Sequence, residues 1–174
     1  SGTIADAAGN AATLTLPTPG STNSLGANKA LIIDTTVPTM AITATDGTSA
    51  VSSGSTTNDA ALIVTFTSSE TTTTFASSDI TVSGGTLGTL SGSGTTYTAT
   101  FTPSADGATT IDVAASTFTD AAGNNSTAAT QYTWTYDGTP PTISSVSLAS
   151  DNSTIAVTLS EAVYNTTGGS GSLE

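Results

Sequence analysis

The chain has 174 residues, of which 36% are hydrophobic and only 8% are charged, and its formal net charge is −12. Lys29 is the one basic residue, so the chain cannot neutralise a row of phosphates, and neither nucleic acid nor an anionic membrane surface is expected as a partner. The lack of cysteine and histidine excludes disulfides, thiolate metal sites and the usual general base of enzymes.

The composition predicts an all-β fold. Threonine, serine, glycine and alanine dominate the sequence, while the runs of Leu, Glu and Lys that favour helices are missing. Apolar and polar residues alternate in many short segments, which argues against disorder. No run of about 18 apolar residues is present, so no membrane insertion is expected.

Residues 1–33 are predicted to be the C-terminal part of a preceding module. They begin with an acidic, turn-rich loop, continue into an alternating strand at residues 12–16 and end in an apolar strand at residues 29–33. This length is too short for a core of its own. The proline-containing stretch that follows, residues 34–38, is expected to be a short, semi-rigid linker.

Residues 34–137 are predicted to form one complete module. Apolar residues recur at every second position in segments that begin near residues 40, 62, 80, 87, 97, 111 and 132, with a long Gly/Ser/Thr loop at 46–59. Seven short strands separated by turn clusters predict an immunoglobulin-like antiparallel β-sandwich. The residues expected in its core are Met40, Leu62, Val64, Phe66, Tyr97, Phe101, Ile111, Val113 and Trp134.

Residues 138–174 are predicted to be the N-terminal part of a following module. They contain two strand segments, 143–148 and 155–161, and the second parallels residues 62–70 of the complete module. Two strands cannot form a sandwich, so we expect their apolar residues to be covered either by further modules of the same chain or by other copies.

Two stretches of sequence are repeated along the chain. Residues 4–10 match residues 118–124, both containing Asp-Ala-Ala-Gly-Asn, and residues 34–39 match residues 137–142, 103 positions later. With the segment 94–103, these stretches resemble the bacterial immunoglobulin-like (Big) tandem repeats of large surface adhesins and biofilm-associated proteins. The resemblance implies non-enzymatic stalk or spacer modules that are secreted or attached to the bacterial cell surface. It also implies calcium at module junctions, as in several such arrays.

The acidic turns predict a candidate calcium site, because Ca²⁺ prefers carboxylate and carbonyl oxygens close to tight turns. In a seven-stranded sandwich the loop before the last strand lies at the pole where the chain enters, and the exit lies near the loop between the first two strands. The expected ligands at the two poles and in the earlier repeat are Asp34, Asp120 and Asn124; Asp137, Asp46 and Asp59; and Asp6 and Asn10. The alternative is that these side chains only stabilise their own turns.

The sequence favours a structural protein over an enzyme, since no nucleophile–base–orienter set can be built without histidine or cysteine. Glu70 and Glu161 belong to different modules and are interpreted as solvated loop residues. The primary interpretation is a stalk or spacer repeat of an extracellular adhesin-like protein, with calcium as the one candidate cofactor. The alternatives are a filament subunit completed by strands of other copies, and a module that binds glycans or proteins.

Overall fold

The computed structural model describes residues 4–12, 18–22, 24–28 and 32–164, and the chain divides into two units, residues 1–34 and 35–174. The first unit contains a bridge between Ala5 and Ala11 and the helical turn α1 (Leu25–Asn28). The strands expected at 12–16 and 29–33 lie mostly outside the described residues. No helix within the described ranges is long and apolar enough to cross a bilayer.

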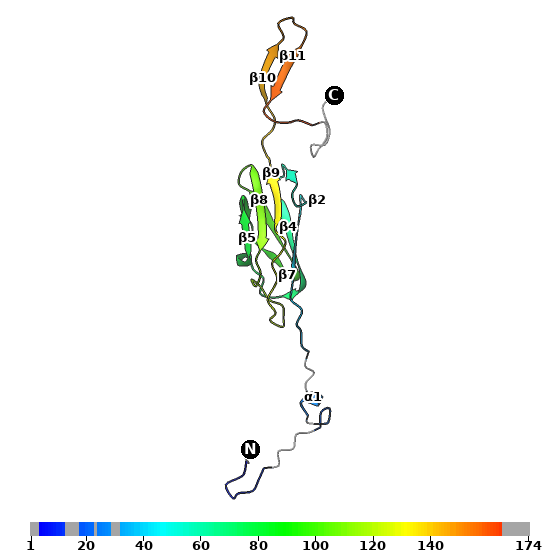
Figure 1. The fold of residues 1–174 in the computed structure, drawn as a ribbon, viewed down its shortest axis with the longest axis vertical. Helices are drawn as coiled ribbons and strands as arrows, with labels where there is room; N and C mark the ends of the chain where they lie inside the picture. Colours follow the sequence, from blue (N-terminus) through cyan, green and yellow to red (C-terminus); the bar gives the residue numbers. More distant parts are fainter. Residues whose placement is uncertain (1–3, 13–17, 23, 29–31, 165–174) are drawn as a thin grey trace. The chain divides into compact units, whose positions relative to one another are not determined.

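The second unit contains a β-sandwich and a separate hairpin (Figure 1). One sheet has the strand order β2-β1-β4-β7-β6 and the other β3-β9-β8-β5, while β10 and β11 form the hairpin. All pairs are antiparallel except β3 with β9. The strands are β1 (Met40–Thr45), β2 (Ala50–Val51), β3 (Thr56–Thr57), β4 (Leu62–Thr72), β5 (Ile80–Ser83), β6 (Gly85–Leu87), β7 (Ser91–Pro103), β8 (Gly107–Val113), β9 (Tyr132–Tyr136), β10 (Ile143–Leu148) and β11 (Ile155–Leu159).

The predicted all-β, immunoglobulin-like sandwich is confirmed, and its core lies between the two sheets. Along β4 every second side chain from Leu62 to Phe66 is fully buried, because successive side chains of a strand point to opposite faces. All nine residues expected in the core are at most 6% exposed. Phe101 and Trp134 meet edge to face across the two sheets, with ring centroids 4.7 Å apart.

The alternation of apolar and polar residues did not predict two aromatic residues that close one end of the core. Phe75 is 6% exposed and Phe118 is 1% exposed, and their ring centroids lie 5.3 Å apart. Phe75 also packs edge to face on Tyr97. Both residues come from segments between strands, where the period-two pattern that reveals strand residues does not apply.

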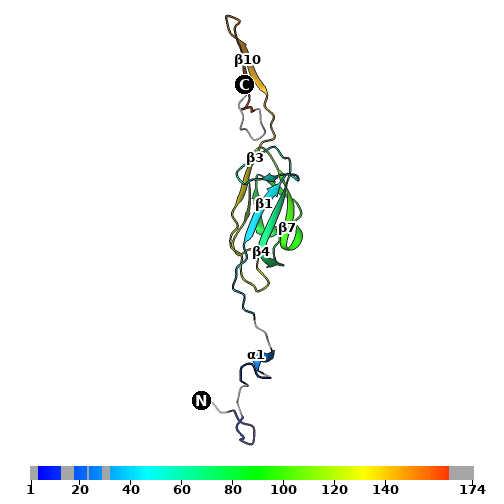
Figure 2. The ribbon, with the colours of Figure 1, turned by 90° about the vertical axis from the view of Figure 1, so that its right-hand side faces the viewer.

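The long loop expected at 46–59 contains two short strands. β2 extends the sheet of β1, whereas β3 pairs with β9, so the chain changes sheet inside this loop (Figure 2). The strand expected at 87–90 is formed slightly earlier, as β6. A Cβ at Gly85 would overlap Thr102 O and the Phe101 ring, so the close approach of β6 to β7 requires glycine at this position.

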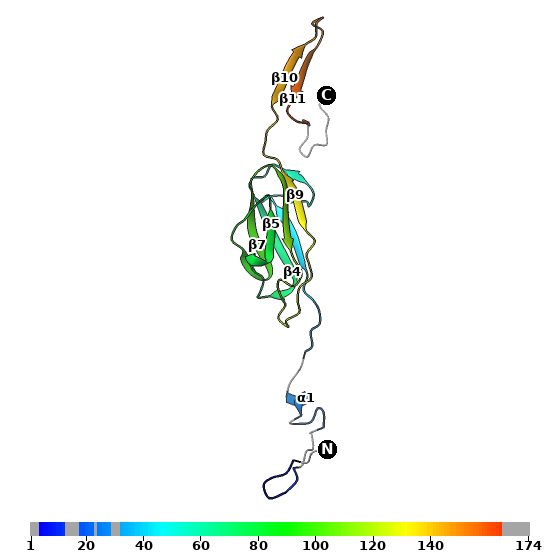
Figure 3. The ribbon, with the colours of Figure 1, turned by 60° about the vertical axis from the view of Figure 1, so that its left-hand side comes forward.

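The chain enters and leaves the sandwich at opposite ends. Met40, the first residue of β1, pairs with Ser68 near the end of β4. Tyr136, the last residue of β9, pairs with Gly107 at the start of β8. The end of β7 pairs with the beginning of β4, and β8 starts just after β7, so β9 finishes at the end of the sandwich where β4 begins. The chain therefore enters the sandwich where β4 finishes and leaves it where β4 begins (Figure 3).

The hairpin β10–β11 corresponds to the strands β1 and β4 of the sandwich, but its apolar residues are exposed to solvent. Its large apolar side chains are 53–66% exposed: Ile143, Val146, Leu148, Ile155 and Val157. On the corresponding strand β4, Leu62, Val64 and Phe66 are fully buried.

Replacing Phe66 by alanine should lower the free energy of unfolding by about 3–5 kcal/mol, because it leaves a cavity in a closed core. Ile63 lies on the outer face of the same strand and is 44% exposed, so Ile63→Ala should cost less than about 1 kcal/mol. Urea unfolding followed by the fluorescence of Trp134 measures both. Equal losses for the two variants would contradict the assigned faces of β4.

Candidate metal site

The loop around Asp120 is built on hydrogen bonds to one carboxylate. Asp120 Oδ1 accepts bonds from the backbone N–H groups of Ala122, Gly123 and Asn124 at 2.9, 2.7 and 2.9 Å, and Oδ2 accepts one from Asn124 Nδ2 at 2.8 Å. Gly123 has φ +94°, a conformation that favours glycine. The Asp-Ala-Ala-Gly-Asn sequence therefore folds as a tight turn around its own aspartate.

Glu70 comes from the end of β4, next to this loop. A β-bridge joins Thr72 to Asp120, and the buried hydroxyl of Tyr97 donates to Thr72 O at 2.8 Å. Glu70 is half-buried, and one of its carboxylate oxygens is shielded from solvent. The core aromatic residues thus hold the strand end that carries Glu70.

Asp34 directly precedes Thr35, the first residue of the second unit. The linker that follows it is tied to the sandwich by main-chain bonds. Thr127 N–H donates to Pro38 O at 3.0 Å, and Ser69 N–H donates to Thr39 O at 2.9 Å. Ser69 Oγ also accepts from Thr39 N–H at 2.9 Å.

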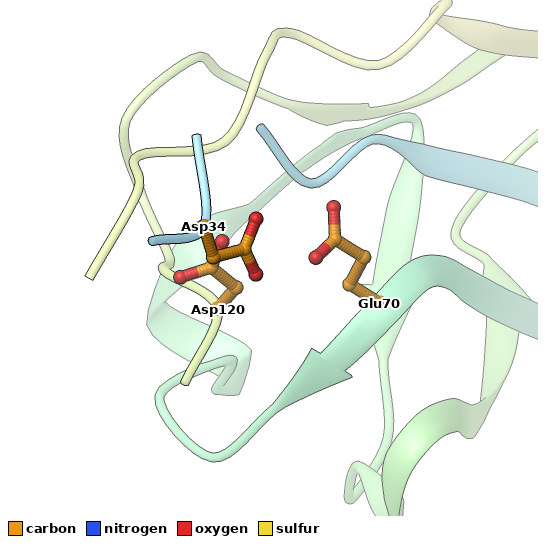
Figure 4. A group of neighbouring side chains, drawn as sticks. All are labelled: Asp34, Glu70 and Asp120. Carbon is orange, nitrogen blue, oxygen red and sulfur yellow. The ribbon is translucent and has the colours of Figure 1, made fainter. Parts of the chain in front are cut away.

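The carboxylates of Asp34, Glu70 and Asp120 form a group that we call the acidic corner. One oxygen from each lies within 4.8 Å of the others (Figure 4). Asp34 is exposed, Glu70 is half-buried and Asp120 is only 7% exposed. Two carboxylates about 4 Å apart repel each other by roughly 1 kcal/mol in water and about 4 kcal/mol near a protein surface. A hard divalent cation would relieve this repulsion, and its preferred ligands are oxygens.

Hydrogen bonding keeps Asp120 ionised. The amide of Asn124 and the backbone N–H groups of the turn lower the pKa of Asp120 below its ordinary value of 3.8, although its burial acts in the opposite direction. The carboxylate is therefore negative at neutral pH and remains a potential cation ligand.

The structure brings together some of the predicted ligands and adds one. Asp34 and Asp120 meet as expected, while Asn124 turns its amide nitrogen toward Asp120. Glu70 was expected to be a solvated loop residue; it is instead a half-buried residue of β4 within the corner. A signal was present in the sequence, since Glu161 follows its strand in the same way.

The earlier repeat forms the same turn as the Asp120 loop. Asp6 Oδ1 accepts from the N–H groups of Ala8 and Asn10 at 3.0 and 2.8 Å, and Asn10 Nδ2 donates to Asp6 Oδ2 at 2.8 Å. These contacts repeat those of Asp120 and Asn124.

The carboxylates expected near the exit serve separate local turns. Asp46 Oδ1 accepts from Thr48 and Ser49 within its own loop, and the Thr57 hydroxyl donates to Asp59. The backbone N–H of Asp137 donates to Thr57 O at 3.0 Å. Within the part of the chain that the structure describes, the acidic corner is the one group of three candidate ligands.

Two hollows lined by described residues of the sandwich contain no carboxylate and no lysine. A hollow of about 690 Å³ is lined by Phe75, Leu87, Leu90 and Tyr97 with small residues between them, and a smaller one of about 320 Å³ lies beside Met40 and Tyr132. Tyrosine is the only titratable type among these linings. The acidic corner is therefore the candidate cation site among the described residues.

Comparison with known families gives one match. The family model described as "Bacterial Ig-like domain" matches residues 34–136, which begins at Asp34 and ends with β9. A search of curated proteins found no match. A search of solved structures found none either.

Replacing Asp120 by asparagine should destabilise the sandwich at neutral pH by an amount that disappears in acid. Because the folded pKa of Asp120 is lowered, its contribution is fully present well above 3.8 and is lost as the pH falls through the folded value. Melting curves followed by Trp134 fluorescence between pH 7 and 2 measure the difference between wild type and Asp120→Asn.

The control is Asp151→Asn, which removes a carboxylate bonded within the separate hairpin. It should leave the melting of the sandwich unchanged at every pH. A gap between wild type and Asp120→Asn that persists unchanged to pH 2 would contradict the assigned role of the charge.

Proposed function

Since the chain belongs to the bacterial Ig-like domain family, whose members often occur in surface or extracellular proteins and are typically non-catalytic, we propose that it is a spacer segment of a tandem array on a bacterial surface. In such a segment stiff modules are joined end to end and hold a functional tip away from the cell. The proposed role is mechanical: the modules resist bending and stretching, and they need no substrate.

The observation that carries this proposal is the position of entry and exit at opposite ends of one closed core. β1 starts at the end of the sandwich where β4 finishes, whereas β9 stops at the end where β4 begins, so each module adds its length to an array. Pulling on the two linkers loads the hydrogen bonds between β1 and β4 along the strands. Many bonds then resist together, as a stalk requires.

The flanking segments support a tandem arrangement. In the hairpin, Ser160 Oγ accepts from Thr142 N–H at 2.9 Å, and Ser160 N–H donates to Thr142 O at 2.7 Å. Ser69 and Thr39 make the same pair of bonds at the entry of the sandwich. These parallels support the proposal that residues 138–174 begin a following module and that residues 1–33, which carry the Asp6 turn, end a preceding one.

The exposed hairpin favours one second candidate function. Its apolar residues correspond to buried positions of β1 and β4, so strands from elsewhere must cover them in an assembled array. If other copies supply these strands, the protein is a filament subunit. The linker sequence recurs after 103 residues, which favours strands of the same chain, and denaturing electrophoresis of native material separates the two cases.

The acidic corner is proposed to hold Ca²⁺ at the entry of the module. Asp34 lies on the linker side, and Glu70 and Asp120 belong to the sandwich, so one ion shared among them would restrict hinge motion. Extracellular sites of this kind bind with a Kd on the order of 10⁻⁴–10⁻³ M. At millimolar calcium the stabilisation would be roughly 0.4–1.4 kcal/mol.

The variant Glu70→Gln tests the ion site, because calcium should have opposite consequences for its stability relative to wild type. Without calcium the variant should melt at a higher temperature than wild type. Glutamine has nearly the same shape as glutamate but carries no charge, so it does not repel the other two carboxylates. With millimolar calcium the wild type should gain stability and the variant should not. Thermal melts in calcium and in chelator measure both effects.

The matched control is Glu161→Gln, which removes the corresponding charge from the hairpin and leaves the acidic corner complete. It should respond to calcium like the wild type. Wild-type melts that coincide in calcium and chelator would refute the ion site while leaving the spacer function untouched.

Pulling the full chain from its two ends tests the spacer function. We expect one abrupt unfolding event that releases the sandwich, with a gain in contour length on the order of 300 Å, since an extended residue spans at most about 3.3–3.6 Å. Single-molecule force spectroscopy records this event. Smooth extension at low force, with no abrupt event, would mean that the module does not resist load.

A further inference from the structure

The exit linker is attached to the sandwich by three hydrogen bonds. The N–H of Asp137 donates to Thr57 O at 3.0 Å, which continues the pairing of β9. Beyond it, the N–H of Gly138 donates to Asp106 Oδ1 at 2.7 Å, and the Thr139 hydroxyl donates to Asp106 Oδ2. One carboxylate therefore holds two successive linker residues, each with a different oxygen.

Asp106 is placed by a firmly built turn between β7 and β8. Ser104 N–H donates to Gly84 O at 3.0 Å, which anchors the turn to the segment before β6. Gly107 has φ +133° and begins β8, where it pairs with Tyr136. The carboxylate thus stands on the rigid sheet, directly beside the strand from which the linker leaves.

The linker residue that donates to Asp106, Gly138, lies against the side chain of Tyr136. A Cβ on Gly138 would lie 2.8 Å from Cζ of Tyr136 and closer still to its hydroxyl oxygen. A side chain at this position would force the tyrosine or the linker to move. The sequence Asp-Gly-Thr at 137–139 therefore supplies a backbone N–H that can approach the sandwich, followed by a hydroxyl donor.

We infer that Asp106 is a latch that fixes the first residues of the exit linker to the sandwich. It limits the directions in which the following segment can leave, and it acts at the end of the module opposite the acidic corner. The inference deepens the proposed spacer function, because linker stiffness is what a spacer needs. It rests on the contacts alone and holds whether or not the corner binds calcium.

The ionisation of Asp106 is consistent with this role. The hydroxyl of Thr139, followed by the N–H of Gly138, lowers the pKa of Asp106 from its ordinary value. The carboxylate is therefore charged at neutral pH, where hydrogen bonds to it are stronger than bonds between neutral groups.

Hydrogen exchange of the Gly138 amide tests the latch in the full chain. Asp106 is distant in sequence from Gly138, so Asp106→Ala does not change the intrinsic exchange rate of that amide. We expect Gly138 to exchange about tenfold faster in Asp106→Ala than in wild type, because the latched state is lost. The Asp137 amide, which bonds to main chain, should change much less.

Two further variants keep the test specific. Asp46→Ala removes an exposed aspartate of another turn and should leave Gly138 as in wild type. Asp106→Asn keeps one carbonyl acceptor for the Gly138 N–H and should restore part of the protection. Equal melting temperatures, read from Trp134 fluorescence, show that the sandwich is intact in all variants.

An unchanged Gly138 exchange rate in Asp106→Ala would overturn the latch. A faster rate shared by Asp46→Ala would also overturn it, since the effect would then be general. Neither result bears on the unfolding event expected under force, so the latch and the spacer function can fail separately.

Discussion

Strand β4 supports both the core and the acidic corner. It is paired along one side with β1 and along the other with β7, and its inward side chains from Leu62 to Phe66 are fully buried. The same strand continues to Glu70 and to Thr72, which is bridged to Asp120. Burial of apolar side chains, at roughly 1.5–3 kcal/mol each, therefore also helps to position the carboxylates of Glu70 and Asp120. The positions of Glu70 and Asp120 therefore depend on the core.

The sequence was sufficient to predict the sandwich because its strands bury one face and expose the other. Side chains that alternate at period two, as in the segment from Tyr97 to Phe101, identify both the strand and its inward face. The same reasoning could not find Phe75 or Phe118, since residues between strands are placed by tertiary packing. Short strands such as β3 could not be predicted in this way either, because two residues are too few to show an alternating pattern.

The candidate site was predicted in part. Chain topology was enough to bring Asp34 and Asp120 together, since it depends only on which loops share a pole. Glu70 was misjudged because a charged residue after an apolar strand is usually solvated, and only the full length of β4 shows that it points into the corner. The carboxylates near the exit, Asp46 and Asp137, were expected to converge. The structure instead gives the linker contact to Asp106, a residue that no sequence pattern singled out.

Native-state hydrogen exchange of the full chain tests most directly whether core and corner form one cooperative unit. The decisive amides are that of Ser69, which donates to Thr39 O at the corner, and those of the β4–β7 ladder around Val64. If β4 unites them, both sets should open with the same free energy and the same dependence on denaturant. Exchange of the Ser69 amide through a separate opening of lower free energy, insensitive to denaturant, would contradict this account.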